Sequence, residues 1–137
     1  MELYLRLILS KPVKKWLDKE KDIQEEDLII ASNEVIKGVF EANLGGNLYK
    51  KRISNNSNQG KSGGSRLIVG YKQANNFYVL FVFNKNESDN ITTKEKQIFK
   101  GMAKQYLKWN NNELDIAIKA KILFEVELED QRGEDNE

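Results

Sequence analysis

The chain has 137 residues and a formal net charge of +1, from 22 basic and 21 acidic side chains. It contains no cysteine and no histidine, which excludes disulfides, thiolate nucleophiles, Ser-His-Asp triads and histidine general bases. We expect one domain over residues 1–128 with a modest core, followed by an acidic, disordered tail over residues 129–137.

The first elements in chain order are a strand and two helices. The apolar opening of the sequence, residues 1–9, predicts an edge strand or a first strand. Ser10 and Pro12 then have the order of a helix cap and an early helical proline. A second helix is expected from about Glu25 to Phe40, and the glycine-containing segment 44–46 predicts a sharp turn after it.

The middle of the chain predicts three strands, over residues 48–53, 66–72 and 76–83, because β-branched and aromatic residues gather there. The segment NQGKSGGSR, residues 58–66, precedes the second of them. It resembles the nucleotide-binding pattern G-x-x-x-x-G-K-[ST], but Asn55 stands where the first glycine is required and a strand follows instead of a helix. We therefore interpret this segment as a flexible, cationic loop.

The remaining residues predict two helices and a last strand. Thr92 and Glu95 have the spacing of a capping box and open a helix, and a shorter helix is expected around Leu114. Residues 122–128 alternate between apolar and acidic side chains, which predicts a half-buried strand. Its inward-facing residues would be Ile122, Phe124, Val126 and Leu128. The fold class is α+β, with helices packed on one face of a mainly antiparallel sheet.

Charge is segregated along the sequence. Residues 42–86 contain seven basic residues and no acidic one, whereas residues 125–137 contain seven acidic residues and one arginine. A solvated surface is the usual explanation of a charge run, but 45 residues without an acid favour a surface that binds a polyanion.

Strand alternation predicts which of these cations share a surface. Lys50 and Arg52 should point to one face of their strand and Lys51 to the other. Arg66 begins the next strand, so it should join Lys50 and Arg52. Such a cluster suits a phosphodiester, since arginine grips phosphate oxygens and stabilises the charge that builds during displacement. In RNA the neighbouring 2′-hydroxyl can be the nucleophile, and no metal is obligatory. The base would then be a lysine made less basic by nearby cations, or a tyrosine.

The alternative for each cation is a surface role, with its alkyl stem packed over apolar residues. We favour that alternative for Lys72 and leave it open for Lys51. For Lys50, Arg52 and Arg66 together we favour function.

Three motifs in a fixed order resemble a known family. They are DLIIASNEVIKGVFEANLGGNLYKKRI (residues 27–53), NQGKSGGSRLIVGY (58–71) and FVFNKNESDNITTKEKQIFKGMAK (81–104). The chain resembles the RelE-type toxins of bacterial toxin–antitoxin pairs over about residues 16–128, and looks closest to the HigB-like branch. The resemblance implies a small RelE-like α+β toxin in the cytoplasm that cuts mRNA in the ribosomal decoding site, without a cofactor. It also implies a cognate antitoxin, often a helix-turn-helix DNA-binding protein.

The resemblance also assigns roles to residues that match the motifs. It implies catalytic roles for Arg52 and Arg66 as phosphate grips and for Lys50 in proton transfer or charge stabilisation. It implies RNA-binding roles for the other matching residues, Lys51, Lys61, Lys85 and Asn86. The chain departs from the family pattern at Ser65 and Asn84, and its acidic tail lacks the C-terminal tyrosine that some relatives use.

Two other functions remain open from the sequence. One is a related, ParE-like toxin that inhibits DNA gyrase by binding it as a protein. The other is a non-catalytic module that binds RNA or an acidic partner and cuts nothing, which the absence of histidine makes more plausible.

Overall fold

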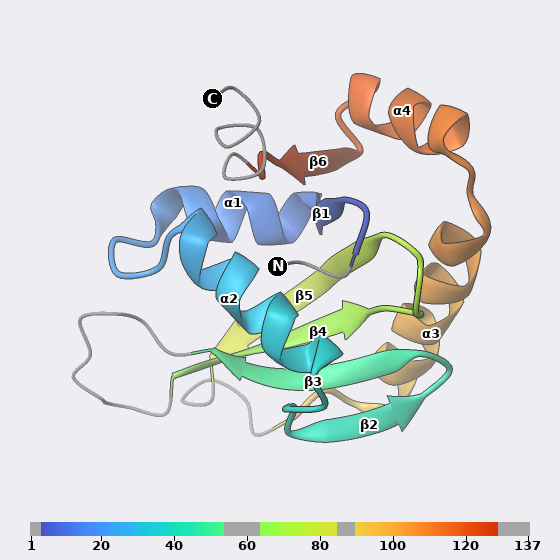
Figure 1. Cartoon of the computed structure of the whole chain (residues 1–137). Helices are drawn as coiled ribbons and strands as arrows, with labels where there is room; N and C mark the ends of the chain where they lie inside the picture. The colour runs from blue at the N-terminus through green and yellow to red at the C-terminus, as the bar shows by residue number, and fades with distance from the viewer. Residues whose placement is uncertain (1–3, 54–63, 85–89, 129–137) are drawn as a thin grey trace.

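The computed structural model describes residues 4–53, 64–84 and 90–128, which build a six-stranded sheet with four helices (Figure 1). The glycine-rich loop over 54–63 and the acidic tail lie outside the described residues. In chain order the elements are β1 (Leu7–Ser10), α1 (Lys11–Lys19), α2 (Glu25–Ile36), β2 (Ala42–Gly45), β3 (Leu48–Ile53), β4 (Ser65–Gly70), β5 (Phe77–Asn84), α3 (Thr93–Lys108), α4 (Asn111–Lys119) and β6 (Leu123–Val126).

The strand order in the sheet is β2-β3-β4-β5-β1-β6. All neighbouring strands are antiparallel except β1 and β5, which are parallel. The α+β class and the mainly antiparallel sheet are therefore confirmed. None of the helices in the described part of the chain is long and apolar enough to cross a membrane.

Helix starts follow the sequence signals. The Ser10 hydroxyl accepts a hydrogen bond from the Val13 amide at 3.4 Å and donates to the Leu80 carbonyl at 2.9 Å, so it caps α1 and ties it to β5. The capping box of Thr92 and Glu95 is formed at the start of α3. The second helix ends at Ile36, earlier than expected.

The segment expected to be only a turn contains a short strand. β2 pairs with β3 through a two-residue turn at Gly46 and Asn47, which have φ angles of 64° and 65°. Two successive residues in the left-handed region are the signature of a type I′ hairpin turn. β2 lies at the edge of the sheet and has only four residues, which is too short for alternation to distinguish a strand from a turn.

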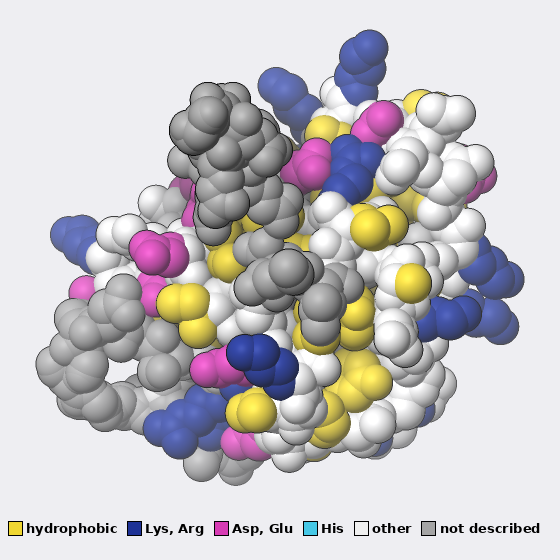
Figure 2. Space-filling view, in the orientation of Figure 1, with side chains coloured by type: hydrophobic (Ala, Val, Ile, Leu, Met, Phe, Trp, Pro, Cys, Tyr) yellow, Lys and Arg dark blue, Asp and Glu magenta, His cyan; other side chains and the backbone are white. Residues whose placement is uncertain are grey.

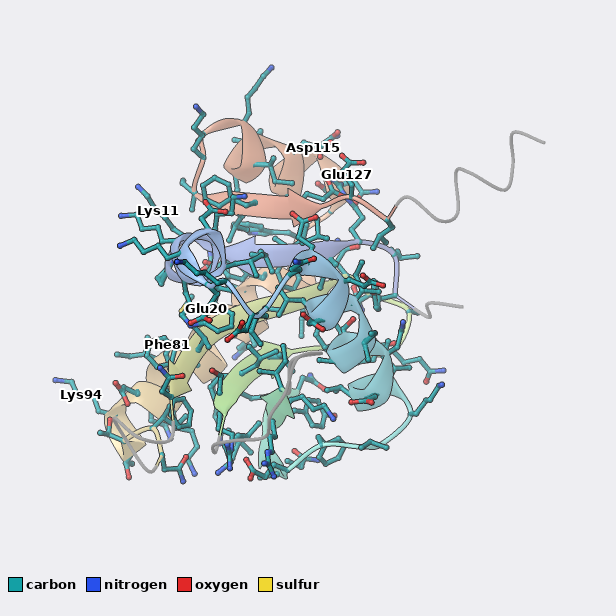
Figure 3. The ribbon with its side chains drawn as sticks, turned by 90° about the vertical axis from the view of Figure 1, so that its left-hand side faces the viewer. Lys11, Glu20, Phe81, Lys94, Asp115 and Glu127 are labelled. Carbon is teal, nitrogen blue, oxygen red and sulfur yellow. The ribbon has the colours of Figure 1, made fainter. Side chains whose placement is uncertain are left out.

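One expectation needs correction, because helices cover both faces of the sheet rather than one. A first core, with residues such as Leu67 and Val69 of β4, packs under α1 and α2. A second core packs under α3 and α4 and contains Ile68, which lies between Leu67 and Val69 in the chain and faces the opposite side of the sheet. Figure 3 shows α2 on one side of the sheet and α3, marked by Lys94, on the other. Residues 67–69 are all apolar because both faces of β4 are covered.

The aromatic residues of β5 are divided between the two faces. The register shifts between the pair Ile68–Phe81 and the pair Val69–Val79, so β5 contains one extra residue there. Phe77 consequently faces α1 and α2, whereas Phe81 and Phe83 face α3. All three pack against helices.

The last strand begins one residue later than expected. Ile122 is 56% exposed, whereas Leu123 is buried against the α3 side of the sheet. The chain turns at Lys121, whose φ is 63°, and this turn carries Ile122 away from the core. Arg6 then fixes β6 through two hydrogen bonds to the Glu125 carboxylate, at 2.9 and 3.0 Å.

The contact between β4 and α3 allows a test of the two-sided fold. A Cβ added at Gly70 would lie 3.0 Å from the Cβ of the fully buried Ala103, which has no rotamer that could move it away. We expect Gly70→Ala to lower the free energy of unfolding by about 1–3 kcal/mol. The matched control is Gly101→Ala on α3, where a Cβ meets nothing within 4 Å and should raise stability by about 0.5–1 kcal/mol. Urea unfolding monitored by circular dichroism measures both, and a stabilising Gly70→Ala would contradict the close approach of α3.

Candidate functional site

Three cations come together on the α3 face of the sheet. Arg52 of β3 and Arg66 of β4 are directly opposite each other in the antiparallel register. Lys50 lies two residues before Arg52 on the same strand, so its side chain leaves the same face. We call Lys50, Arg52 and Arg66 the cationic cluster. Figure 2 views the molecule from the side of α1 and α2 in Figure 1, so the face of the sheet that carries the cationic cluster is turned away from the viewer.

Glu41 connects two members of the cationic cluster. Its Oε1 accepts a hydrogen bond from Nε of Arg66 at 2.9 Å and lies 3.9 Å from Nζ of Lys50. Its backbone amide also donates to the Lys50 carbonyl at 2.7 Å. Cations that converge repel one another, and a carboxylate shared by Arg66 and Lys50 reduces the repulsion between these two. Glu41 therefore makes the convergence of these cations stable.

Our interpretation of the sequence missed Glu41. It stands immediately before the acid-free segment 42–86, in the connection between α2 and β2. This position was the only indication in the sequence, because an acid that directly precedes a cationic segment can pair with its cations once the chain folds back. Among the described residues, no other carboxylate forms a salt bridge with the cationic cluster.

The three cations differ in their access to solvent. The side chains of Lys50 and Arg66 are 15% and 8% exposed. Arg52 is exposed and makes no salt bridge with the carboxylates of the described residues. An incoming anion would therefore meet Arg52 first and find the other two cations already oriented.

Lys51 departs from the RNA-binding role expected from its motif. Its side chain is only 8% exposed, lies on the α1 and α2 face, and pairs with Oε1 of Glu34 of α2 at 2.7 Å. The strand alternation predicted this opposite direction, which removes Lys51 from the surface that holds the cationic cluster. Through this ion pair Lys51 instead connects β3 to α2.

The remaining expected site residues, Lys61, Lys85 and Asn86, lie outside the described residues. Ser65 and Asn84, the two departures from the family pattern, are partners of each other. The hydroxyl of Ser65 donates to Oδ1 of Asn84 at 2.7 Å, and the two residues are directly opposite in the sheet. This hydrogen bond joins the ends of β4 and β5 beside Arg66.

The described tyrosines do not supply a base at the cationic cluster. Tyr49 packs its ring against Phe40, with centroids 4.9 Å apart, on the α2 side. Burial raises the pKa of Tyr78 and of Tyr106, which stabilises their neutral forms. Tyr78 is also paired with Gly70, at the end of β4 opposite to Arg66. Within the described residues no group of three histidine, cysteine, aspartate or glutamate side chains is arranged to hold a metal ion.

Comparison with known proteins gives one family. The family model of the RelE toxin of the RelE/RelB toxin–antitoxin system matches residues 5–126, which include every strand and helix from β1 to β6. No curated protein matches the chain significantly.

The Lys51–Glu34 pair provides a test of the placement of Lys51. Glu34→Gln leaves the buried ammonium without its counter-charge, so we expect the free energy of unfolding to fall by about 1–3 kcal/mol. The double variant Glu34→Gln/Lys51→Met removes the buried charge as well and should recover most of that loss. Thermal and urea unfolding measure both effects. Equal losses in the single and the double variant would show that Lys51 is not a buried partner of Glu34.

Proposed function

The chain belongs to the RelE toxin family, and on this premise we propose that it is a metal-independent endoribonuclease that cuts mRNA on the ribosome and so stops translation. Family membership makes it the toxin of a toxin–antitoxin pair with an antitoxin as its partner. We further propose that it is a HigB-like toxin of the cytoplasm and that its antitoxin is a helix-turn-helix DNA-binding protein.

The observation that carries the nuclease proposal is the cationic cluster with Glu41 at its centre. Arginines positioned before the substrate arrives can stabilise the extra charge of a phosphorane-like transition state without reorganisation. Arg66 is held by Glu41 at 2.9 Å. Arg52, which lies opposite Arg66 on the neighbouring strand, is exposed to solvent and accessible to a phosphate. This arrangement supports a phosphodiester as the reacting group.

The reaction that fits these groups is an attack by the RNA on itself. The 2′-oxygen forms a bond to phosphorus and the bond from phosphorus to the 5′-oxygen breaks, which leaves a 2′,3′-cyclic phosphate and a 5′-hydroxyl. We propose that the carboxylate of Glu41 accepts the proton of the 2′-hydroxyl and that the ammonium of Lys50 gives a proton to the departing 5′-oxygen. Arg52 and Arg66 grip the phosphate oxygens between them. Lys61, Lys85 and Asn86 are proposed to hold the RNA on either side.

Primer extension on a reporter mRNA in a translating extract tests the function. We expect cuts that require ribosomes, and a decrease of about 100-fold or more for Lys50→Gln/Arg52→Gln because two groups that contact the reacting phosphate are lost. The control variant Lys37→Gln/Lys72→Gln makes the same charge change at two exposed lysines and should cut like the parent protein. An intact message with translation still running would refute the nuclease proposal, and loss of DNA supercoiling in its place would identify a gyrase inhibitor.

The Glu41→Gln variant tests the proposed proton acceptor. The amide oxygen can still accept the hydrogen bond from Arg66, but it is a far weaker base than a carboxylate, so we expect cleavage to fall by about 10²–10⁴-fold. Binding of the RNA should be unchanged or tighter, because a negative charge beside the phosphate is removed. The cleavage rate on programmed ribosomes and the affinity for the same RNA separate these effects. Undiminished cleavage would exclude Glu41 as the base.

A further inference from the structure

Helix α3 carries a row of four lysines at intervals of four residues. They are Lys96, Lys100, Lys104 and Lys108, which we call the α3 lysine stripe. Residues four apart lie on neighbouring turns of one helix face, with about 6 Å between them along the axis. Lys96 and Lys100 are partly buried, and Lys104 and Lys108 are exposed.

Among the residues that the structure describes, no acid pairs with the α3 lysine stripe. The single acid of α3 is Glu95, which is occupied in the capping box with Thr92. In the described part of the chain none of the four lysines forms a salt bridge. Like charges at this spacing destabilise a helix, and Lys94 adds a cation in the first turn, where the helix dipole is unfavourable. Helix stability therefore does not explain the pattern.

Helix α1 provides a comparison within the same chain. It also has lysines four residues apart, at Lys11, Lys15 and Lys19. There, however, Lys14 pairs with Asp18 at 3.2 Å on the neighbouring positions. α1 thus holds one acid that pairs with a lysine, whereas the one acid of α3 is occupied in its capping box.

The α3 lysine stripe lies on the same side of the sheet as the cationic cluster. The side chain of Lys100 crosses the β2–β3 turn, where a Cβ on Gly45 would come within 3.3 Å of its Nζ. Leu48, the first residue of β3 after this turn, packs under α3, and Arg52 lies four residues farther along, about 13 Å away. In Figure 2 dark blue side chains project at the right-hand edge, where α3 lies in Figure 1.

We propose that the α3 lysine stripe binds the phosphate backbone of double-helical RNA. Its axial spacing is comparable to the separation of successive phosphates along one RNA strand, and its ammonium groups are point charges that suit phosphates without reading bases. The exposed neighbours Gln97, Gly101 and Gln105 offer no aromatic ring on which an unpaired base could stack. The inference rests on the proposed function in one respect, because a nuclease that works on the ribosome meets helical RNA beside the message.

The test compares two variants of the full-length protein with equal charge. Lys100→Gln/Lys104→Gln/Lys108→Gln removes three charges from α3, and Lys11→Gln/Lys15→Gln/Lys19→Gln removes three from α1 on the other side of the sheet. Fluorescence anisotropy with a labelled RNA hairpin, across a potassium chloride series, measures affinity and its salt dependence. We expect the α3 variant to bind at least tenfold more weakly, with the slope of log K against log salt reduced by about 2–3. The α1 variant should bind like the parent protein.

Each other outcome overturns the inference in an identifiable way. Equal weakening in both variants would mean a general charge effect, and no weakening in either would mean that α3 does not touch RNA. An equal loss on a single-stranded probe of the same composition would refute the choice of double-helical RNA. Circular dichroism shows that each variant is folded. Because the hairpin assay requires no cleavage, a parent protein that binds through α3 but cuts no message would refute the nuclease proposal alone.

Discussion

Helices on both faces of the sheet impose the main constraint on where this chain can place its charges. β4 and β5 are buried over almost their whole length, so their middle residues must be apolar on both faces. The buried charged groups of β3 and β4 are each paired with a glutamate, and Arg52 reaches solvent. The convergence of the cationic cluster follows from this constraint together with the antiparallel register that sets Arg52 opposite Arg66.

The acid-free segment 42–86 has acidic partners in the folded structure. Glu34 and Glu41 both precede it in the chain, yet they pair with Lys51 on one face of β3 and with Lys50 and Arg66 on the other. The two pairs have different consequences. Glu34 fixes a cation between β3 and α2, whereas Glu41, with its side chain 35% exposed, holds two cations beside an arginine that is open to solvent. Only the second arrangement includes a cation that is exposed to solvent.

Local patterns in the sequence predicted much of the fold and the directions of the site residues. Strand alternation placed Lys50 and Arg52 opposite to Lys51, and capping residues marked the starts of α1 and α3. The features that the sequence patterns could not predict depend on contacts between segments that are distant in the chain. The bulge in β5, the edge strand β2 and the cover of both faces arise from how strands and helices pack, and no local periodicity encodes them. Glu41 was missed for the same reason, since its role appears only when β2 folds back onto β3.

The chain thus carries two kinds of cation on one side of its sheet, and physical chemistry gives them different tasks. Lys50 and Arg66 are largely buried and paired with Glu41, so their orientations are fixed before a ligand arrives and their fields are little screened by salt. The lysines of the α3 lysine stripe are unpaired within the described residues and stand on long, flexible stems. Their fields extend into solvent and weaken with salt, which suits them to attract a polyanion rather than to stabilise a transition state. Because a cation held by a carboxylate attracts a distant anion poorly, a site built on paired cations gains from unpaired ones nearby. In the proposed function, this division of charge between β3, β4 and α3 would separate capture of RNA from the chemistry performed on it.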